Sequence, residues 1–364
     1  MQTTINKKDF INALSIGGAM AGKAKTMPIL EYTKVVATTD TLTLYSFDTE
    51  CGITKRTKAT CSEEGEFAVN AIELIKVLKS LVEEEVTFAV SDTTLTINHI
   101  KGTIEMPIVS ASTFPSNIKG EGDTKEFDIA CDKLQEWVGV ATNFAASDDL
   151  RPIMCGMYLY SQEGKLGMCA TDAHKLYTDS FDSEYGDFHA VVPARAFKSL
   201  LTLVGCCDKV RVVLDNRNIT FATEDSELCC RLVEGAYPNF RAVVPQNNPV
   251  RVEVSKAELV DSITRASLMA NKTTSLLKLS VSDEVMTIEG SDIDFSRKAK
   301  ESVTVKKSGD DVEIGVKSEF FGTCLSAVDA EDVVMKMCDG TRAIVFEDMT
   351  NPNKVVLVMP MRIE

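Results

Sequence analysis

Four kinds of sequence position recur along this chain at one nearly constant interval. They are helix-opening apolar residues, strand-ending acids, apolar residues of a later helix, and prolines after an aromatic residue or methionine: Phe10, Leu134 and Leu259; Asp48, Asp172 and Asp292; Leu74, Phe197 and Phe320; Pro115, Pro238 and Pro360. The intervals lie between 120 and 125 residues, which is too long for a solenoid repeat and about right for a whole domain. We therefore expect three tandem copies of one domain, at 1–120, 121–247 and 248–364.

Helices and pairs of strands follow one another in the same order in every copy. Apolar residues at three- and four-residue steps predict the helices, and alternation with a period of two around Gly, Asp or Asn predicts antiparallel strand pairs. The predicted elements are first helices at 7–21, 131–146 and 255–270, strand pairs at 30–48, 157–172 and 277–292, second helices at 70–81, 193–204 and 317–328, and closing strands such as 86–99 and 210–223. The predicted class is α+β, with an antiparallel sheet and two helices in each domain.

The composition limits where in the cell we expect the protein and which kinds of partner it can bind. No segment approaches the roughly 18 continuous apolar residues of a membrane span, and the start, MQTTINKKDF, has charges where a signal peptide needs apolar residues. We expect a cytoplasmic protein without a membrane partner. The net charge of −15 argues against a surface uniformly attractive to nucleic acid, although a local basic lining is compatible with it.

The 11 cysteines show no C-x-x-C spacing, and two adjacent pairs, Cys206–Cys207 and Cys229–Cys230, are awkward disulfide partners. We expect mainly buried thiols in a reducing compartment, in preference to redox groups.

The sequence offers little catalytic chemistry. Gly17-x-x-x-x-Gly22-Lys23 resembles a phosphate-binding P-loop, but an alanine follows it and a helix pattern, not a strand, precedes it. Asp172 and His174 are close in sequence, yet no G-x-S-x-G motif accompanies them. The three histidines lack the spacing of metal ligands. We therefore expect a protein that is not an enzyme and needs no cofactor or metal.

Two segments carry a more specific signal. ATDAHKL (170–176) and the terminal VMPMRIE (358–364) resemble the bacterial DNA polymerase III beta sliding clamp family, in which they usually read A-T-D-G-H-R-L and M-P-M-R-L. TMPIL (26–30), FPS (114–116) and YPNFRAVVP (237–245) match as well. The resemblance spans the whole chain. It implies a head-to-tail homodimeric ring of six similar domains, with helices around the hole and sheets outside, through which duplex DNA passes without base-specific contacts.

The resemblance implies a processivity factor that tethers the replicative polymerase to its template. Its partners would be double-stranded DNA, a second copy, the alpha-type subunit of DNA polymerase III, the clamp loader, repair polymerases and mismatch repair factors. The alternative is a clamp-like DNA-binding scaffold in repair or in a mobile element. The predicted DNA contacts are Lys23, Lys25, Lys76, Lys79, Arg195, Lys198, Arg265 and Lys272. The alternative for each is an ordinary solvated helix face.

The family also has a peptide-binding cleft in the middle domain, completed by the C-terminal strand. Carried over by motif, its lining is Met154, Thr171, Ala173, His174, Lys175, Leu176, Pro238, Val243, Met359, Pro360, Met361 and Arg362. From the residues alone these could also be strand ends packed into a core. Ala173 stands where the family usually has Gly, Lys175 where it has Arg, and Ala242 where an Arg is common. These departures affect which peptide is preferred.

Overall fold

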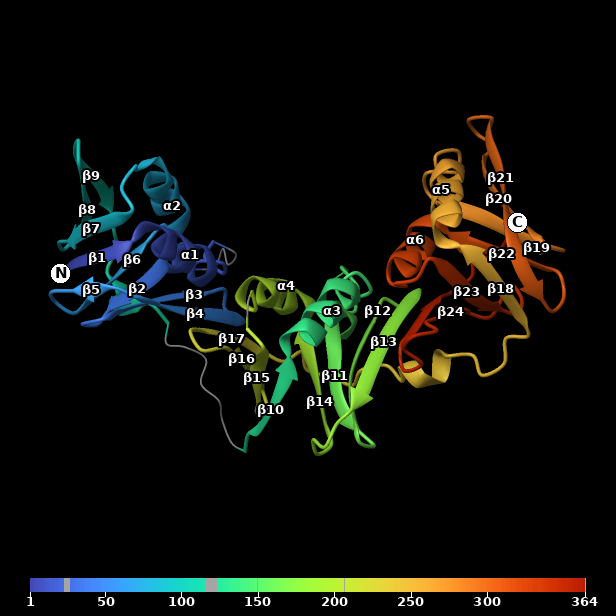
Figure 1. The fold of residues 1–364 in the computed structure, drawn as a ribbon, viewed down its shortest axis with the longest axis horizontal. Coiled ribbons are helices and arrows are strands. Elements are labelled where there is room, and N and C mark those ends of the chain that lie inside the picture. The colour runs from blue at the N-terminus through green and yellow to red at the C-terminus, as the bar shows by residue number, and fades with distance from the viewer. Residues whose placement is uncertain (23–26, 116–122, 149, 206, 364) are drawn as a thin grey trace. The chain divides into compact units, whose positions relative to one another are not determined.

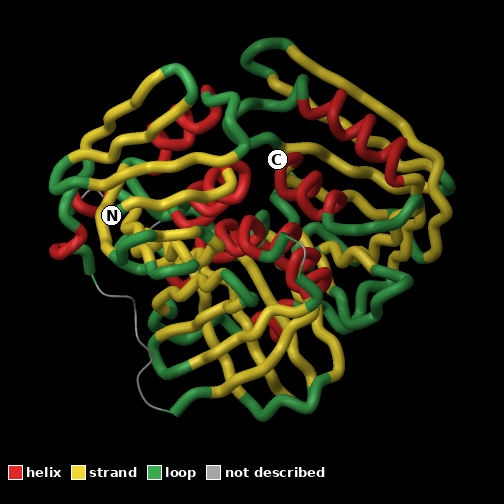
Figure 2. Tube along the Cα trace, turned by 60° about the vertical axis from the view of Figure 1, so that its left-hand side comes forward, coloured by secondary structure: helices red, strands yellow, loops and turns green. Residues whose placement is uncertain are grey.

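The computed structural model describes residues 1–22, 27–115, 123–148, 150–205 and 207–363 (Figure 1). It forms two compact units. The first unit contains Met1–Glu136 and Arg195–Leu232, and the second contains Trp137–Ala194 and Val233–Glu364. Each unit is described separately below, and in both of them helices pack against strands (Figure 2).

The described residues form six α-helices, and all six lie where the sequence predicts them. They are α1 (Lys7–Gly17), α2 (Ala71–Ser80), α3 (Cys131–Ala141), α4 (Ala194–Leu203), α5 (Lys256–Ser267) and α6 (Ser318–Ser326). Two helices have asparagine caps: the Asn6 side chain accepts hydrogen bonds from the N–H groups of Lys8 and Asp9, and Asn70 accepts one from Glu73. The first helix of each copy ends earlier than predicted, because the apolar pattern continues into residues that adopt turns.

The first unit contains two antiparallel sheets. One has the order β5-β1-β7-β8-β9 and the other β10-β15-β16-β17-β4-β3-β2-β6. Their strands are β1 (Gln2–Asn6), β2 (Thr33–Ala37), β3 (Thr41–Phe47), β4 (Cys51–Lys58), β5 (Thr60–Cys61), β6 (Gly65–Val69), β7 (Glu85–Val90), β8 (Thr94–His99), β9 (Gly102–Pro107), β10 (Lys125–Ala130), β15 (Lys209–Leu214), β16 (Asn218–Ala222) and β17 (Ser226–Arg231). The helices α1 and α2 bury Phe10, Leu14, Leu74 and Leu78 in the core of the first copy.

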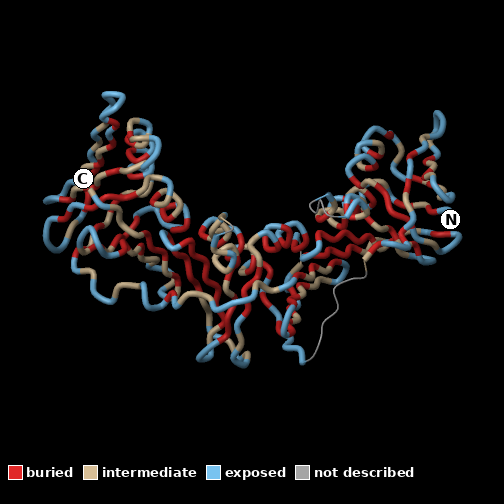
Figure 3. Tube along the Cα trace, turned by 180° about the vertical axis from the view of Figure 1, so that it is seen from behind, coloured by how far each residue is buried: buried red, intermediate tan, exposed pale blue. Residues whose placement is uncertain are grey.

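The second unit contains one antiparallel sheet of the order β14-β11-β12-β13-β25-β24-β23-β18-β21-β20-β19-β22. Its strands are β11 (Gly156–Gln162), β12 (Lys165–Thr171), β13 (Lys175–Asp182), β14 (Phe188–Pro193), β18 (Val250–Ser255), β19 (Leu276–Ser282), β20 (Val285–Asp292), β21 (Arg297–Ser308), β22 (Val312–Lys317), β23 (Asp332–Met337), β24 (Ile344–Glu347) and β25 (Val355–Val358). Two short 3-10 helices, η3 (Pro152–Cys155) and η4 (Phe240–Val243), lie outside it. Buried residues follow the strands, and exposed residues gather at the turns (Figure 3).

The repeat is visible in the packing, with one correction to the predicted anchors. Phe197 of α4 packs on Phe221 with ring centroids 5.5 Å apart, and Phe321 of α6 packs on Phe346 at 5.3 Å. Phe321 is fully buried, whereas Phe320, the predicted anchor, is only partly buried. The equivalent of Phe197 is therefore Phe321.

Strand pairing joins one copy to the next. In the first joint, β4 of the first copy pairs with β17 of the middle copy, with Cys51 opposite Cys230. In the second joint, β13 of the middle copy pairs with β25 of the third, with Lys175 opposite Val358. Each joint lies inside one compact unit. The sheets therefore run on from one copy into the next.

Candidate peptide and nucleic-acid interfaces

The strand-ending acids of the first and middle copies shape the turns that lead into the joints. The Oδ1 atom of Asp172 accepts hydrogen bonds from the N–H groups of His174 and Lys175, both at 2.9 Å, and Asp48 receives the equivalent bonds from Glu50 and Cys51. A short carboxylate that bonds backbone two and three residues ahead favours such a turn. This explains why an aspartate recurs at these strand ends.

The 170–176 motif lies on the turn that carries the second joint. Ala173 adopts a left-handed φ of 75°, which a glycine would adopt without steric cost. Asp172 also forms a buried ion pair with Lys175. The lysine is therefore held in position by its own turn, whereas the resemblance predicts it in the lining of the cleft.

The C-terminal residues are bound to this turn and to the third copy. The Met359 N–H donates a 2.7 Å hydrogen bond to the His174 carbonyl, and the Met361 N–H donates a 2.8 Å bond to the Gly315 carbonyl. Gly315 is required there, because an added Cβ would lie 2.6 Å from the Met361 carbonyl oxygen. The structure thus brings the two most specific sequence motifs together.

Phe320 belongs to the same surface, and the sequence reasoning did not assign it there. The His174 imidazole stacks on the Phe320 ring with centroids 5.3 Å apart and planes 15° apart. The Lys175 ammonium lies 5.1 Å from the centre of the same ring, a cation–π contact. The signal that was available is the adjacent pair Phe320–Phe321, since consecutive helical residues cannot both face one core.

A cluster of aromatic side chains packs beneath the turn at residues 172–176, on its buried side. Tyr158 and Tyr237 stack with centroids 4.8 Å apart, and the Arg241 guanidinium lies 5.0 Å from the centre of the Tyr160 ring. Burial raises the pKa of Tyr237 well above its usual range. These rings pack around the buried side chain of Leu176, so Leu176 supports the surface more than it lines it.

The twelve predicted cleft residues differ in exposure. Thr171, Lys175 and Leu176 are buried; Met154, Pro238, Met359, Pro360 and Met361 are partly exposed; Ala173, His174, Val243 and Arg362 are exposed. Met154 lies in η3, which follows Arg151, and Arg151 donates a 3.1 Å hydrogen bond to the Asp172 carbonyl. The turn is therefore bordered by η3 as well as by β25.

The predicted DNA contacts fall into three groups. Lys23 and Lys25 lie outside the described residues. The side chains of Lys76, Lys79, Lys198 and Lys272 are exposed on or just after helices. Arg195 is paired with Glu50 and Asp48 in the first joint. Arg265 lies 2.8 Å from Glu301, and their hydrogen bond lowers the pKa of that carboxyl.

The enzyme-like sequence match has a packing explanation. Gly17 ends α1, and an added Cβ would lie 2.6 Å from the Leu44 Cβ atom, so a glycine is needed for the helix to approach β3. No strand precedes it as a P-loop requires, because Gly17 is itself helical. Among the described residues, no group of three or more His, Cys, Asp or Glu side chains is placed to hold a metal ion.

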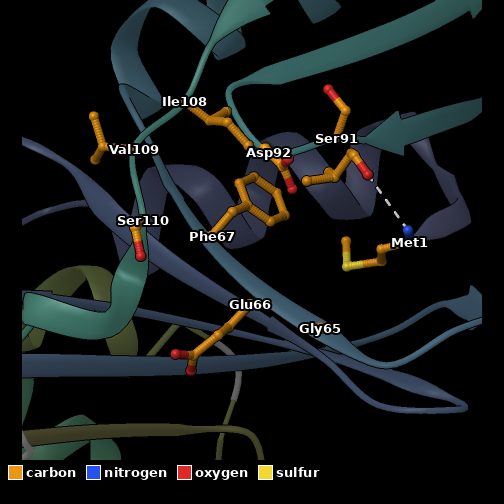
Figure 4. Close-up of a pocket in the computed structure, with 10 residues that line it drawn as sticks. Met1, Gly65, Glu66, Phe67, Ser91, Asp92, Ile108, Val109 and Ser110 are labelled. Carbon is orange, nitrogen blue, oxygen red and sulfur yellow. Dashed lines mark hydrogen bonds between the residues drawn. The ribbon is translucent and has the colours of Figure 1, made fainter.

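A cavity of about 320 Å³ lies in the first copy beside the N-terminus (Figure 4). Phe67 and Ile108 form part of its wall, and the Met1 amine bonds the Val90 carbonyl at 3.4 Å. Glu66 and Asp92 are its acidic residues, and Ser91 and Ser110 are its hydroxyl residues. Within the part of the chain that the structure describes, no helix is long and apolar enough to cross a membrane.

Three similar α+β domains, joined by strand pairing and carrying an exposed turn beside the chain's end, define a tandem-domain clamp fold. Models of the DNA polymerase III beta subunit match the chain in succession: the N-terminal domain over residues 1–119, the central domain over 128–239 and the C-terminal domain over 241–362. The chain therefore belongs to the DNA polymerase III beta subunit family. It is a non-catalytic sliding clamp that works with DNA and polymerase in replication.

Relatives and solved structures agree over the full length. The chain is 25% identical over 369 residues to the beta sliding clamp of Pseudomonas aeruginosa and 24% identical over 369 residues to that of Escherichia coli K12, with 100% of each chain covered. A crystal structure of a P. aeruginosa sliding clamp bound to griselimycin superposes with a TM-score of 0.94 at 24% identity, and one from Bacillus subtilis with 0.93 at 20%, again over 100% of each chain. At these identities the structural likeness establishes the shared fold.

Proposed function

We propose that two copies of this chain close head to tail into a ring around duplex DNA, and that the surface around His174 binds peptides of the polymerase, the clamp loader and repair factors. In this proposal the domains have the bounds expected from the sequence, namely 1–120, 121–247 and 248–364. One observation supports the ring. The chain contains two joints built in the same way, and its described strands include two open edges, one on the third domain and one on the first, that could form a third joint between two copies.

The first unpaired half lies on the third domain. At the joints inside the chain, the opening residues of β4 and β13 pair with a strand of the next domain. The equivalent strand is β21, which pairs with β20 from Arg297 to Thr304 and with β18 only from Val305 to Ser308. Its opening residues therefore present one open edge among the described strands.

The second unpaired half lies on the first domain. The strands β17 and β25 each end their domain's strand series and donate an edge to the preceding domain. Their equivalent in the first domain is β9, which lies at the edge of its five-stranded sheet. Extending the register of the existing joints puts Arg297 opposite Met106 of a second copy. Lys298 then faces Glu105 across the two strands, a favourable pair of opposite charges.

At each joint a turn of one domain also contacts a helix of the next domain, and the proposed third joint has a matching turn and helix. At the first joint Glu50 of the turn meets Arg195 of α4, and at the second His174 meets Phe320 of α6. In the third domain the corresponding turn exposes Ile293 (89%) and Phe295 (69%), and α2 exposes Ile72 (66%). Arg297 takes the place of Lys175 and would approach Glu73 of α2 in the second copy. Apolar burial with one ion pair would close this joint.

DNA is held by enclosure and by weak contacts. The net charge of −15 opposes tight binding to phosphate, while exposed lysines on helices permit salt-sensitive, sequence-independent contacts. We assign this role to Lys76, Lys79, Lys198 and Lys272, together with Lys23 and Lys25 from the sequence. Arg195 already serves the first joint.

The experiment combines mass and retention. Light scattering at micromolar concentration should give twice the 39.8 kDa chain mass. Protein loaded on nicked circular DNA should remain bound and be released when the circle is linearised. A monomer at every concentration, or equal retention on linear and circular DNA, would contradict the ring. Copurification with a repair complex but never with a replicative polymerase would favour the scaffold alternative.

A further inference from the structure

Two cysteines from distant parts of the sequence are in direct contact in the first unit. The Cys207 sulfur lies 3.2 Å from the Cys131 sulfur. Both thiols also point at one carbonyl, that of Val204, at 3.5 Å and 3.0 Å respectively. The contact is built by the sheet, because the Cys131 N–H bonds the Asp208 carbonyl at 3.0 Å, directly beyond the β10–β15 pairing of Ala130 with Lys209.

The two thiols differ in access. Cys131 is 5% exposed at the start of α3, and burial raises its pKa to about 11. Cys207 is partly exposed and lines a cavity of about 800 Å³ with Asn12, Ile16 and Leu203 among its walls. A small oxidant can therefore reach the Cys207 sulfur from the cavity. The buried Cys131 sulfur, in contact with Cys207, is placed to act as the resolving thiol.

We propose that Cys131 and Cys207 are a thiol-oxidation site that closes into a reversible disulfide on reaction with a peroxide. The Cys207 thiolate attacks one oxygen of hydrogen peroxide, the O–O bond breaks, and a sulfenic acid and hydroxide form. The Cys131 sulfur then attacks the sulfenic sulfur, the S–O bond breaks, and the hydroxyl leaves as water with the proton of Cys131. Two thiols and one peroxide give one disulfide and two waters, and a dithiol reductant reverses the change.

The cross-link would tie the first residue of α3 to the segment after α4, closing a loop between positions 76 residues apart. Long closed loops reduce the freedom of the unfolded chain. Oxidised protein should therefore unfold at a higher temperature than reduced protein. A second pair provides an internal comparison: Cys51 and Cys230 face each other across the first joint but are both 0% exposed, so they should remain reduced.

The test is a titration of the full chain with hydrogen peroxide, followed by peptide mapping without reduction. We expect the loss of two of the 11 thiols and one cross-link between tryptic peptides 126–133 and 199–209, removed by dithiothreitol. Because the second peptide also contains Cys206, the Cys206→Ser variant should still form the link, and Cys207→Ser should not. A link that disappears in Cys206→Ser, a link at Cys51–Cys230 at the same dose, or overoxidation without any link would overturn the proposal. Where a variant folds poorly, fragmentation of the wild-type cross-linked peptide between residues 206 and 207 assigns the link to one of the two cysteines.

Discussion

The backbone N–H of Met359 donates a 2.7 Å hydrogen bond to the carbonyl of His174, so the end of the chain and the turn of the middle domain form one surface. A shift of either segment alone would break this hydrogen bond. Changes that move the terminal residues should therefore alter peptide binding, even where they leave the side chains on the turn unchanged.

Gly315→Ala should weaken peptide binding without removing a peptide-facing group. Its Cβ would lie 2.6 Å from the Met361 carbonyl oxygen, so the terminal residues must move, at a cost of about 1–3 kcal/mol. Fluorescence anisotropy with a labelled peptide containing a glutamine and two apolar anchors measures the effect. Gly322→Ala is the matched control, since nothing lies within 4 Å of its added Cβ. Equal peptide affinity of the two variants would show that the C-terminal residues do not contribute to the peptide-binding site.

Phe320→Ala should reduce peptide affinity roughly fivefold, because an aromatic contact contributes about 1 kcal/mol. The substitution removes the ring that holds both His174 and Lys175. Met349→Ala, at a side chain 73% exposed in the same unit, is the control and should bind normally. The same peptide titration gives the answer, and an unchanged affinity for Phe320→Ala would exclude its ring from the site.

Sequence reasoning predicted the elements of this fold well and its joints poorly. Helix and strand periodicity are local, so all six predicted helices are confirmed. Phe320 was chosen one position from the true packing equivalent because Phe320 and Phe321 lie 123 and 124 residues after Phe197, and a count by interval cannot choose between these adjacent residues. Pairing of β4 with β17 depends on residues far apart in sequence, and no local pattern encodes it. The motifs predict a peptide-binding surface at this turn, and that surface stays a prediction. The burial of Leu176 is visible only in the structure.

Lys55→Ala should destabilise the first unit by about 1–2 kcal/mol, less than a fully buried pair because the partner is half exposed. The Lys55 side chain is 8% exposed and its ammonium lies 2.5 Å from Asp225, whose side chain is 54% exposed. Urea unfolding at neutral pH measures the loss. Lys58→Ala, on the exposed end of the same strand, should change little, and an equal loss there would mean that the ion pair is not responsible.

Acid should abolish the difference between wild type and Lys55→Ala. Burial is the largest single influence on Asp225 and opposes its ionisation. The hydrogen bonds from Lys55 and Ser226, together with the charge of Lys55, outweigh burial and hold the pKa of Asp225 below its ordinary value of 3.8. A depressed folded-state pKa contributes stability above the unfolded-state pKa that is lost as pH falls through the folded-state value. Unfolding midpoints compared from neutral pH downward should therefore converge below about pH 4. A constant difference down to the lowest pH would argue against the pair.

Glu73→Arg or Arg297→Glu alone should shift the dimer toward monomer, because each places like charges at the proposed third joint, and the double exchange should restore it. Light scattering over a dilution series measures the equilibrium. Glu258→Arg, in the first turn of α5, changes the charge equally and should leave the mass unchanged. Failure of the double exchange to recover any dimer would contradict the assigned contact.

Replacing Lys76 and Lys79 together with Glu should shorten retention on circular DNA and flatten its salt dependence, since two phosphate contacts are lost. Lys58→Glu together with Lys101→Glu, both exposed and outside the helices, is the control with the same change in net charge. Retention at several salt concentrations measures both effects. If the control loses retention equally, bulk charge and not helix position governs the contact.

The strand pairing at the two joints within the chain has a consequence for where such a ring can come apart. Separating β4 from β17, or β13 from β25, leaves their partners tethered by the same polypeptide, so the broken contact re-forms at a high effective concentration that dilution cannot lower. The junction between copies has no such tether, and its re-formation depends on how many other molecules are nearby. In the proposed ring, opening should therefore occur between the two chains, at the interface formed by β9 of one copy and β21 of the other.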